Sequence, residues 1–305
     1  MQKIHFISAI DKQTISLATA LKNIDFEVSI SEENISLSLK ENFKKNNLNF
    51  YEGWRPNNIT KNIDFIILGS NLNNNNSEFV RAESLKIKIF SITQFINYFS
   101  KEKTRVLVAG RTYGKTSIIS IILHVLKFHD FSFDFIINKK VSAFDSSIHL
   151  SKENDFIIIE GNENILPKID NLSKFEFFNP HLAIITSMFW KHVERHSSFE
   201  GYKKYFSLLI DNIVPGGTLI YNENDHQTNN LVKNSNHTIK KKSYSSPRSV
   251  IFKGVVNLQT EEGNYPLISH NDYSLINIGG ALWACQLIGI YQSDFYEAII
   301  SYQGD

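Results

Sequence analysis

The segment most suited to chemistry is a glycine-rich turn followed by lysine and threonine. Residues 105–117 read RVLVAGRTYGKTS, an apolar run that ends at Gly110 and leads into the apolar helical pattern IISIILHVL. Backbone N–H groups converge at such a strand-to-helix turn and bind phosphate oxygens, while lysine adds positive charge and the threonine hydroxyl binds Mg²⁺. The spacing is one residue shorter than G-x-x-x-x-G-K-[ST], and a plain glycine turn before a buried helix is the alternative. We therefore predict a phosphate-binding loop that comprises Gly110, Arg111, Thr112, Gly114, Lys115, Thr116 and Ser117.

Two further candidates follow later strand patterns. Glu160 ends the apolar run DFIIIE, and His192 lies in the aromatic segment FWKHVERH after the run LAIITS. Ligands of parallel sheets bind beyond the carboxyl ends of the strands, where a carboxylate can hold the Mg²⁺ of a nucleotide. A polar strand end and a surface histidine are the alternatives. We predict Glu160 as a magnesium ligand and expect His192 in the same cleft.

The segment YNENDHQT places Asn222 and Asp225 at another strand end. These side chains can contact a nucleobase or ribose, or they can cap a helix that starts near His226. Without further context, helix capping is the favoured interpretation.

The elements that must position these residues alternate between strand and helix patterns. Residues 3–9, 26–30, 64–70 and 86–90 are strand-like, and a second series follows at 105–109, 155–160, 182–187 and 218–222. Helical patterns occur at 15–21, about 33–46 and 92–99 in the first series, and near 115–128, 198–212 and 277–291 in the second. The polar stretch SKEKT at 100–104 separates the two series, so we predict domains at 1–100 and 101–305. The alternation predicts an α/β fold with a mostly parallel sheet, and residues 234–274 are expected to be rich in hairpins.

Composition excludes several classes of protein. The 305 residues include 32 Lys and Arg against 31 Asp and Glu, a net charge of +1, so no global field favours nucleic acid or an anionic membrane, and any anion site must be local. A single cysteine, Cys285, cannot form an internal disulfide. No apolar run approaches the roughly 20 residues of a membrane span. We expect a cytoplasmic protein without nucleic acid or membrane insertion.

The order of these motifs resembles the Mur ligases, the ATP-dependent amide ligases of peptidoglycan synthesis, in the branch that adds L-alanine or a murein tripeptide. The matching segments are HFISAID, GRTYGKTS, EGNEN, FWKHVE, YNEND and the helix NIGGALWACQLIG. The resemblance implies a Rossmann-like UDP-sugar domain followed by a P-loop-type central ATPase domain. It implies ATP and Mg²⁺ as cofactors, with Lys115 and His192 in catalysis and Thr116, Glu160 and His192 at magnesium. It also implies Asn222, Asp225 and Asn277 on the base or ribose side of ATP.

In this family, ATP phosphorylates a UDP-N-acetylmuramate carboxylate, and the amine of an amino acid or peptide attacks the acyl phosphate. The likeness therefore implies a peptide ligase of peptidoglycan synthesis or recycling. The chain departs from the family pattern at several places. Ile10 and Asp11 replace two glycines of the UDP loop, Arg111 and Tyr113 replace Gly and His, and Lys191 replaces an acidic residue. The chain also ends where the family's third domain would begin.

These departures leave three interpretations open. The first is a Mur-type ligase with weakened substrate sites. The second is a non-catalytic relative that binds or regulates cell-wall enzymes, and the third is an unrelated P-loop ATPase, against which the HFI opening and the aromatic histidine loop both argue.

Overall fold

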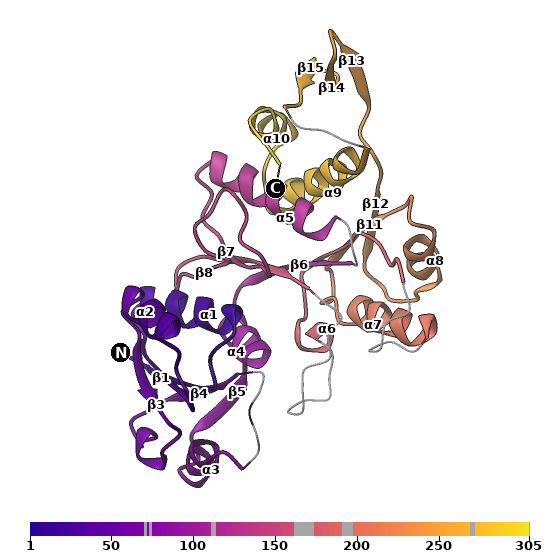
Figure 1. The fold of residues 1–305 in the computed structure, drawn as a ribbon. Coiled ribbons are helices and arrows are strands. Elements are labelled where there is room, and N and C mark those ends of the chain that lie inside the picture. The colour runs from indigo at the N-terminus through magenta and orange to yellow at the C-terminus, as the bar shows by residue number, and fades with distance from the viewer. Residues whose placement is uncertain are drawn as a thin grey trace. The chain divides into compact units, whose positions relative to one another are not determined.

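The computed structural model describes residues 1–69, 72, 75–110, 114–161, 174–190, 198–268 and 272–304. Strands and helices alternate along the chain (Figure 1), which forms two compact units, one built mainly from Met1–Glu102 and the other mainly from the residues that follow. Both large sheets are parallel in all the strand pairs described below, which confirms the predicted α/β class.

The first unit is a five-stranded parallel sheet in the order β3-β2-β1-β4-β5. Strand order reverses between β1 and β4, and α1 and α2 lie on one face of the sheet and α3 on the other (Figure 1). Such a change of face is what the general right-handed rule for parallel crossovers leads one to expect. In such sheets the ligand crevice lies at the carboxyl ends of the strands beside the reversal. The elements are β1 (Lys3–Ile7), α1 (Lys12–Asn23), β2 (Glu27–Glu32), α2 (Leu37–Lys45), β3 (Asn49–Glu52), the 3₁₀ turn η1 (Pro56–Asn58), β4 (Phe65–Leu68), α3 (Ser77–Ser84), β5 (Lys88–Ser91) and α4 (Ile92–Phe99).

Short polar side chains start each helix of the first unit. Asp11, Ser36 and Asn76 cap α1, α2 and α3 by accepting hydrogen bonds from backbone N–H groups of the first turn. Ser91 caps α4 in a reciprocal arrangement with Gln94. These caps satisfy backbone donors that a helix leaves without intrahelical partners, so the local sequence fixes where each helix begins.

The second unit is built on a sheet in the order β12-β11-β10-β6-β9-β7-β8, parallel in every pair from β12 to β7. Its first strand, β6, is central, and the strand order reverses between β6 and β10. Helices α5 and α9 cover one face and α6 and α7 the other (Figure 1). The elements are β6 (Thr104–Ala109), α5 (Lys115–Phe128), β7 (Asp134–Ile136), β8 (Ile148–His149), β9 (Phe156–Glu160), α6 (Lys174–Phe177), β10 (Leu182–Ile185), α7 (Phe199–Asp211), β11 (Thr218–Asn222), α8 (His226–Asn234), β12 (Lys240–Tyr244), α9 (Asp272–Ile288) and α10 (Gln292–Ile299).

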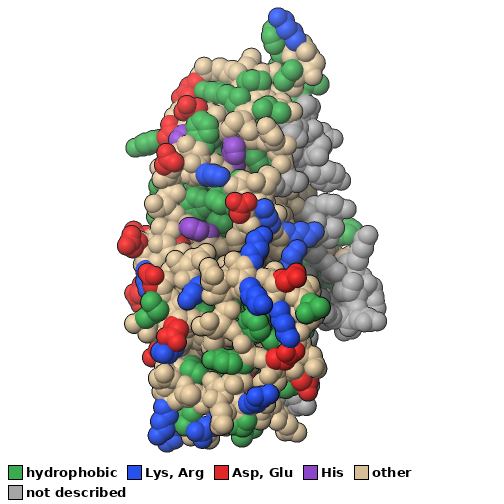
Figure 2. Space-filling model, turned by 60° about the vertical axis from the view of Figure 1, so that its left-hand side comes forward, with side chains coloured by type: hydrophobic (Ala, Val, Ile, Leu, Met, Phe, Trp, Pro, Cys, Tyr) green, Lys and Arg blue, Asp and Glu red, His purple; other side chains and the backbone are tan. Residues whose placement is uncertain are grey.

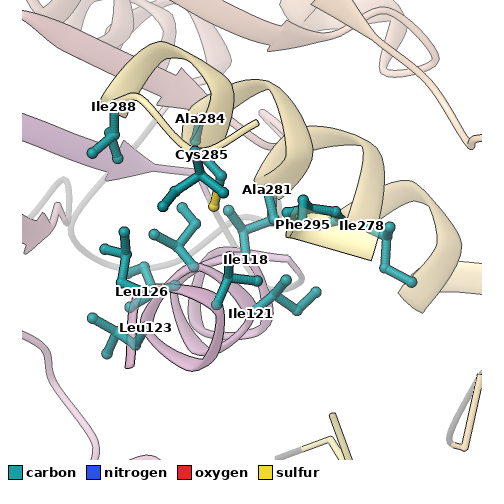
Figure 3. Close-up of a cluster of buried hydrophobic side chains, with 14 of the residues drawn as sticks. Ile118, Ile121, Leu123, Leu126, Ile278, Ala281, Ala284, Cys285, Ile288 and Phe295 are labelled. Atoms are coloured by element: carbon teal, nitrogen blue, oxygen red, sulfur yellow. The ribbon is translucent and has the colours of Figure 1, made fainter. Parts of the chain in front are cut away.

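The core of the second unit forms where α5 and α9 meet (Figure 3). Large aliphatic side chains of α5 pack on small ones of α9, namely Ile118, Ile121, Leu123 and Leu126 against Ala281, Ala284 and Cys285. At Gly280, a Cβ would lie 2.9 Å from Cδ1 of Ile118 and 3.0 Å from the ring of Tyr244. Close packing at this glycine holds the middle of α9 near the N-terminal part of α5.

Residues 249–266 form a small antiparallel sheet, β13 (Ser249–Phe252), β14 (Val255–Gln259) and β15 (Asn264–Pro266), which confirms the hairpins expected in this region. The expectation was wrong for Lys240–Tyr244, which instead forms the edge strand β12 of the large parallel sheet. Its three lysines are exposed, so the segment KKKSY lacks the apolar pattern of a buried strand.

No helix in the described part of the chain is both long and apolar enough to cross a bilayer.

Candidate functional site

The candidate site begins at the turn between β6 and α5. Gly114 is the N-cap of α5 at φ +96°, and as a glycine it has no side chain with which to cap this helix. The first-turn N–H groups and the positive end of the helix dipole are therefore presented at the carboxyl edge of the sheet, where Lys115, Thr116 and Ser117 follow. These three side chains are partly buried. Arg111 and Thr112, also predicted for this loop, lie outside the described residues.

Both described glycines of the loop, Gly110 and Gly114, are packed closely against neighbouring elements. A Cβ on Gly110, whose φ is +142°, would lie 2.1 Å from Oγ1 of Thr186 after β10. A Cβ on Gly114 would lie 2.9 Å from Oδ1 of Asn277 in α9. Side chains at these positions would force the loop away from β10 and α9, so glycine is required by close approach as well as by backbone conformation.

Glu160 lies beside this turn, as predicted from its place at a strand end. It is the last residue of β9, which pairs with β6, and it is 8% exposed. Thr116 Oγ1 donates to Glu160 Oε1 at 3.3 Å, and the backbone N–H of Asn138 donates to Glu160 Oε2 at 2.8 Å. The carboxylate is thus oriented toward the first turn of α5.

The donor set fits a magnesium ion shared with a ligand. Hydroxyl and carboxylate oxygens are the ligands that Mg²⁺ prefers, and the ion commonly takes one or two protein oxygens together with phosphates and water. Thr116 and Glu160 supply such oxygens 3.3 Å apart. The described residues contain no group of three or more His, Cys, Asp or Glu side chains that would enclose a metal on their own. His192, the third predicted ligand, lies outside the described residues.

A cleft of about 410 Å³ opens next to the loop, at the carboxyl side of β10 and β11. Its position agrees with the strand-order reversal between β6 and β10, where ligands of open α/β sheets bind. Its walls combine amide, hydroxyl, carboxylate and apolar groups from Gly114, Thr186, Ser187, Phe189, Asn222, Asn224, Asp225, Ile276 and Asn277. This combination suits a planar base with polar edges and an attached sugar.

Asp225 has the capping role that the sequence favoured and also lines the cleft. Its Oδ1 accepts from the backbone N of Thr228 at 2.8 Å and from that residue's hydroxyl at 2.6 Å, which caps α8. The same oxygen accepts from the backbone N of Met188 at 3.3 Å. One carboxylate therefore ties the segment after β10 to the start of α8 and fixes one wall of the cleft.

The structure brings the predicted Gly114, Asn222, Asp225 and Asn277 into one cleft. It also adds five residues that the sequence did not single out, Thr186, Ser187, Phe189, Asn224 and Ile276. Thr186 and Ser187 directly follow β10, so their place at a strand end was a usable signal. Phe189 and Asn224 lie in the segments FWKHVE and YNEND that carry the family resemblance, whereas Ile276 has no distinguishing pattern in the sequence.

The corresponding turn of the first unit has a different chemistry. Asp11 caps α1 with its own carboxylate, which accepts from the backbone N of Thr14 at 2.9 Å and from the hydroxyl of the same residue. Ile10, just before it, is 41% exposed. A negative group of the protein therefore already occupies the helix N-terminus at which a diphosphate would bind.

Fold and site together define an α/β protein in which a Rossmann-like unit is followed by a unit of the P-loop ATPase type. Residues 108–280 match the Mur ligase middle domain, a match that covers more than half of the chain. The chain belongs to the Mur ligase family.

Individual relatives agree with this assignment. UDP-N-acetylmuramate--L-alanine ligase from Dictyoglomus turgidum is 24% identical over 322 residues, which cover 99% of this chain and 65% of that protein. The enzyme of the same name from Carboxydothermus hydrogenoformans is 22% identical over 316 residues, covering 100% of this chain and 66% of that protein. The chain thus spans slightly less than two thirds of the length of these relatives.

Solved structures share the fold. UDP-N-acetylmuramate:L-alanyl-gamma-D-glutamyl-meso-diaminopimelate ligase from Neisseria meningitides superposes with a TM-score of 0.81 at 16% identity, covering 99% of this chain and 98% of that one. UDP-N-acetylmuramate-alanine ligase from Thermotoga maritima gives a TM-score of 0.69 at 18% identity and covers 100% of this chain and 69% of that one.

Proposed function

We propose that this chain is the nucleotide-binding core of an ATP-dependent amide ligase that acts in peptidoglycan synthesis or recycling. On this proposal, residues 101–305 form the ATP-binding domain and residues 1–100 a UDP-sugar-type domain. The substrates are a UDP-N-acetylmuramate-type carboxylate and an amino acid or peptide, in a reaction that takes place in the cytoplasm. The observation that carries the proposal is the convergence of a helix N-terminus with glycine as its N-cap, Lys115, Thr116 and Glu160 beside one cleft.

Each residue has a defined role in this proposal. The N–H groups at the start of α5 bind phosphate oxygens, and Lys115 places a cation beside the transferring phosphoryl group. Thr116 and Glu160 hold Mg²⁺, which supplies charge neutralisation on the phosphates. The cleft holds the base and ribose, with Asn222, Asn277 and Asp225 on its polar walls. We expect Arg111 and Thr112 to contact phosphates and His192 to complete the metal site, as the family likeness implies.

The binding test is calorimetric titration with Mg·ATP. Lys115→Ala removes the cation next to the phosphates, and we expect it to weaken Mg·ATP binding by at least about a hundredfold, equivalent to about 3 kcal/mol. Lys204→Ala is the matched control, because Lys204 is an exposed lysine on α7 of the same unit. Equal affinity of Lys115→Ala and the unsubstituted protein would contradict the proposed phosphate site.

One observation favours a second candidate, a family member that binds nucleotide without ligation. The carboxylate of Asp11 occupies the anion position of the first unit, which weakens the case for a bound UDP-sugar. Release of phosphate from ATP that requires both UDP-N-acetylmuramate and an amino acid or peptide would establish the ligase. Tight Mg·ATP binding without such turnover would favour the binding protein, with a cell-wall enzyme as its partner.

A further inference from the structure

Although the net charge of the whole chain is close to zero, residues 226–260 form a basic stretch. Residues 226–260 contain no Asp or Glu, although the whole protein has 31. The same stretch has six Lys and Arg residues, all exposed, at positions Lys233, Lys240, Lys241, Lys242, Arg248 and Lys253. The stretch includes β12 and the first hairpin of the small sheet. This stretch of the second unit is therefore locally basic, although the whole chain is nearly neutral.

The turn of that hairpin combines positive charge with exposed apolar side chains. Lys253 and Gly254 form the turn between β13 and β14, both with positive φ, at 50° and 77°. Ile251 is 75% exposed and Phe252 59% exposed on one side of the turn, and Val255 is 41% exposed on the other. In Figure 2, hydrophobic and Lys or Arg side chains gather over the β13–β15 sheet at the top of the view.

The strand register extends this apolar surface across the sheet. Phe252 pairs with Val255, and Leu267 donates to the carbonyl of Val256 at 2.9 Å, which places Ile268 level with Val255. Side chains alternate between the faces of a strand. Val256 and Leu267 are buried in the core of the unit, so Phe252, Val255 and Ile268 form a row on the outer face. We call these three residues together with Ile251 the apolar tip. Ile251 pairs with Val256 and so points to the other face of the hairpin, where it is exposed beside the turn, and Ile268 is 63% exposed.

Acidic residues of the small sheet lie at its opposite end. Glu261 and Glu262 are in the turn between β14 and β15, where Gln259 pairs with Asn264. Gln259 also donates its N–H to the carbonyl of Arg248, at the start of the hairpin. The hairpin is therefore polarised, with the apolar tip and Lys253 at one end and both carboxylates at the other.

We propose that the apolar tip docks this protein onto the surface of a bilayer that contains anionic phospholipid. Aliphatic and aromatic side chains enter the boundary between headgroups and acyl chains, while a lysine beside them extends its ammonium group to the lipid phosphates. This contact is peripheral, and it requires no helix that spans the membrane.

Other occupants fit the tip less well. A stable dimer interface involves about 20–30 residues from each partner, whereas the tip has four side chains. Nucleic acid binds to cationic side chains and stacks on aromatic rings, but contact with the aliphatic side chains of Ile251, Val255 and Ile268 adds little to its binding. The surface of an anionic bilayer can bind both the ammonium group of Lys253, through lipid phosphates, and the aliphatic side chains, through the acyl-chain boundary.

The experiment is sedimentation of the full chain with vesicles of phosphatidylcholine, with and without phosphatidylglycerol. We expect binding to the vesicles that contain phosphatidylglycerol, weakened by salt. The double substitution Ile251→Ser with Phe252→Ser should lower the vesicle affinity by about tenfold or more, and Lys253→Glu should weaken binding at low salt. Leu37→Ser and Lys61→Glu are matched controls, because Leu37 is 80% exposed and Lys61 is exposed, both on the first unit.

Several results would overturn the proposal. These are no binding to phosphatidylglycerol vesicles, equal binding to pure phosphatidylcholine, and unchanged binding of the double variant with its circular dichroism spectrum intact. A dimer that forms without lipid and dissociates in the double variant would assign the tip to contact between copies. Binding of RNA or DNA but not of vesicles, with loss in Lys253→Glu, would assign the stretch to nucleic acid.

Discussion

Two buried glutamates of the first unit differ in the hydrogen-bond donors around them. Glu78 Oε1 accepts from Asn58 at 2.6 Å and from the backbone N of Arg55 at 3.1 Å, while its other oxygen accepts from Ser31. Burial alone would raise the pKa of Glu78, but the hydrogen bonds from His5, Ser31 and Asn58 outweigh it and lower the pKa. The ionised carboxylate is therefore stable inside this unit.

Glu32 is also buried, but it accepts fewer hydrogen bonds than Glu78. It is 7% exposed, and its Oε1 accepts from the backbone N of Glu33 at 3.0 Å, whereas its Oε2 has no hydrogen-bond partner among the described residues. Burial raises the pKa of Glu32 above its usual value and outweighs the hydrogen bonds from the Glu33 backbone and the Ser8 side chain, which lower it. The charges of Glu33 and Glu78 raise the pKa further. Ionised Glu32 therefore costs stability at neutral pH.

This difference predicts a pH-dependent effect of Glu32→Gln. A carboxyl group whose pKa is raised in the folded state adds stability when it is protonated, and that contribution is lost as the pH rises through the folded pKa. Glu32→Gln should raise the melting temperature by about 2 °C at pH 7 and by less near pH 4. Thermal unfolding of both proteins at the two pH values measures the difference.

The neighbouring residue provides the control for this prediction. Glu33 is exposed, so Glu33→Gln should change the melting temperature little at either pH. A Glu32→Gln protein that is less stable than the unsubstituted chain at pH 7 would show that the carboxylate is ionised and well solvated in the folded state.

At the residue scale, sequence reasoning located structural positions where residue type itself constrains the backbone or marks a strand end. Glycine, lysine and threonine at a strand-to-helix junction indicated the turn at Gly114, and a carboxylate at a strand end indicated Glu160. Phe189 and Ile276 are ordinary apolar residues, and their place in the cleft depends on the strand order and on the packing of α9. No local pattern encodes that placement.

At the scale of elements, the contact between α5 and α9 connects the core to the site. Asn277 in the first half of α9 lines the cleft together with Gly114 at the start of α5, and the two helices pack through the cluster of Figure 3. The geometry of the cleft therefore depends on buried side chains that do not themselves line it.

Leu123→Ala tests this dependence. Leu123 is fully buried in the α5–α9 cluster, so its truncation leaves a cavity and should destabilise the second unit by about 3 kcal/mol. Leu287→Ala on α9 is the control, since Leu287 is 49% exposed and its loss should cost no more than about 0.5 kcal/mol. Calorimetric unfolding measures both, and equal effects of the two substitutions would contradict the packing described here.

Elements with strong periodicity were predictable, and weakly patterned ones were not. The apolar run of β6 and the helix after it were identified from the sequence. The sequence analysis missed β3, which has four residues at a sheet edge and no buried side chain. It also missed α3, an eight-residue helix whose N-cap, Asn76, ends a run of asparagines that resembles a loop.

At the scale of the whole molecule, the two units differ in the residue that caps the first helix after the first strand, and therefore in how well that helix N-terminus can bind an anion. In the second unit the N-cap of the helix after the first strand is Gly114, which has no side chain, and Lys115 follows it. In the first unit the equivalent helix begins with the carboxylate of Asp11 as its cap. A helix N-terminus that already interacts with the carboxylate of Asp11 attracts a diphosphate less strongly, and the carboxylate and the diphosphate repel each other.

The last prediction is that binding of UDP-N-acetylmuramate is weak in this chain and is restored by removing that carboxylate. We expect no micromolar affinity for the unsubstituted protein and at least about tenfold tighter binding for Asp11→Gly, because glycine frees the first-turn N–H groups and replaces an N-cap at a cost of only a few tenths of a kcal/mol. Asp25→Gly is the control, since it removes an exposed carboxylate beyond the far end of α1, where the backbone already has a φ of 65°. Micromolar binding by the unsubstituted chain would show that Asp11 does not block the site. Unchanged affinity in Asp11→Gly would instead place the obstacle in the exposed side chain of Ile10, which the further substitution Ile10→Gly then tests.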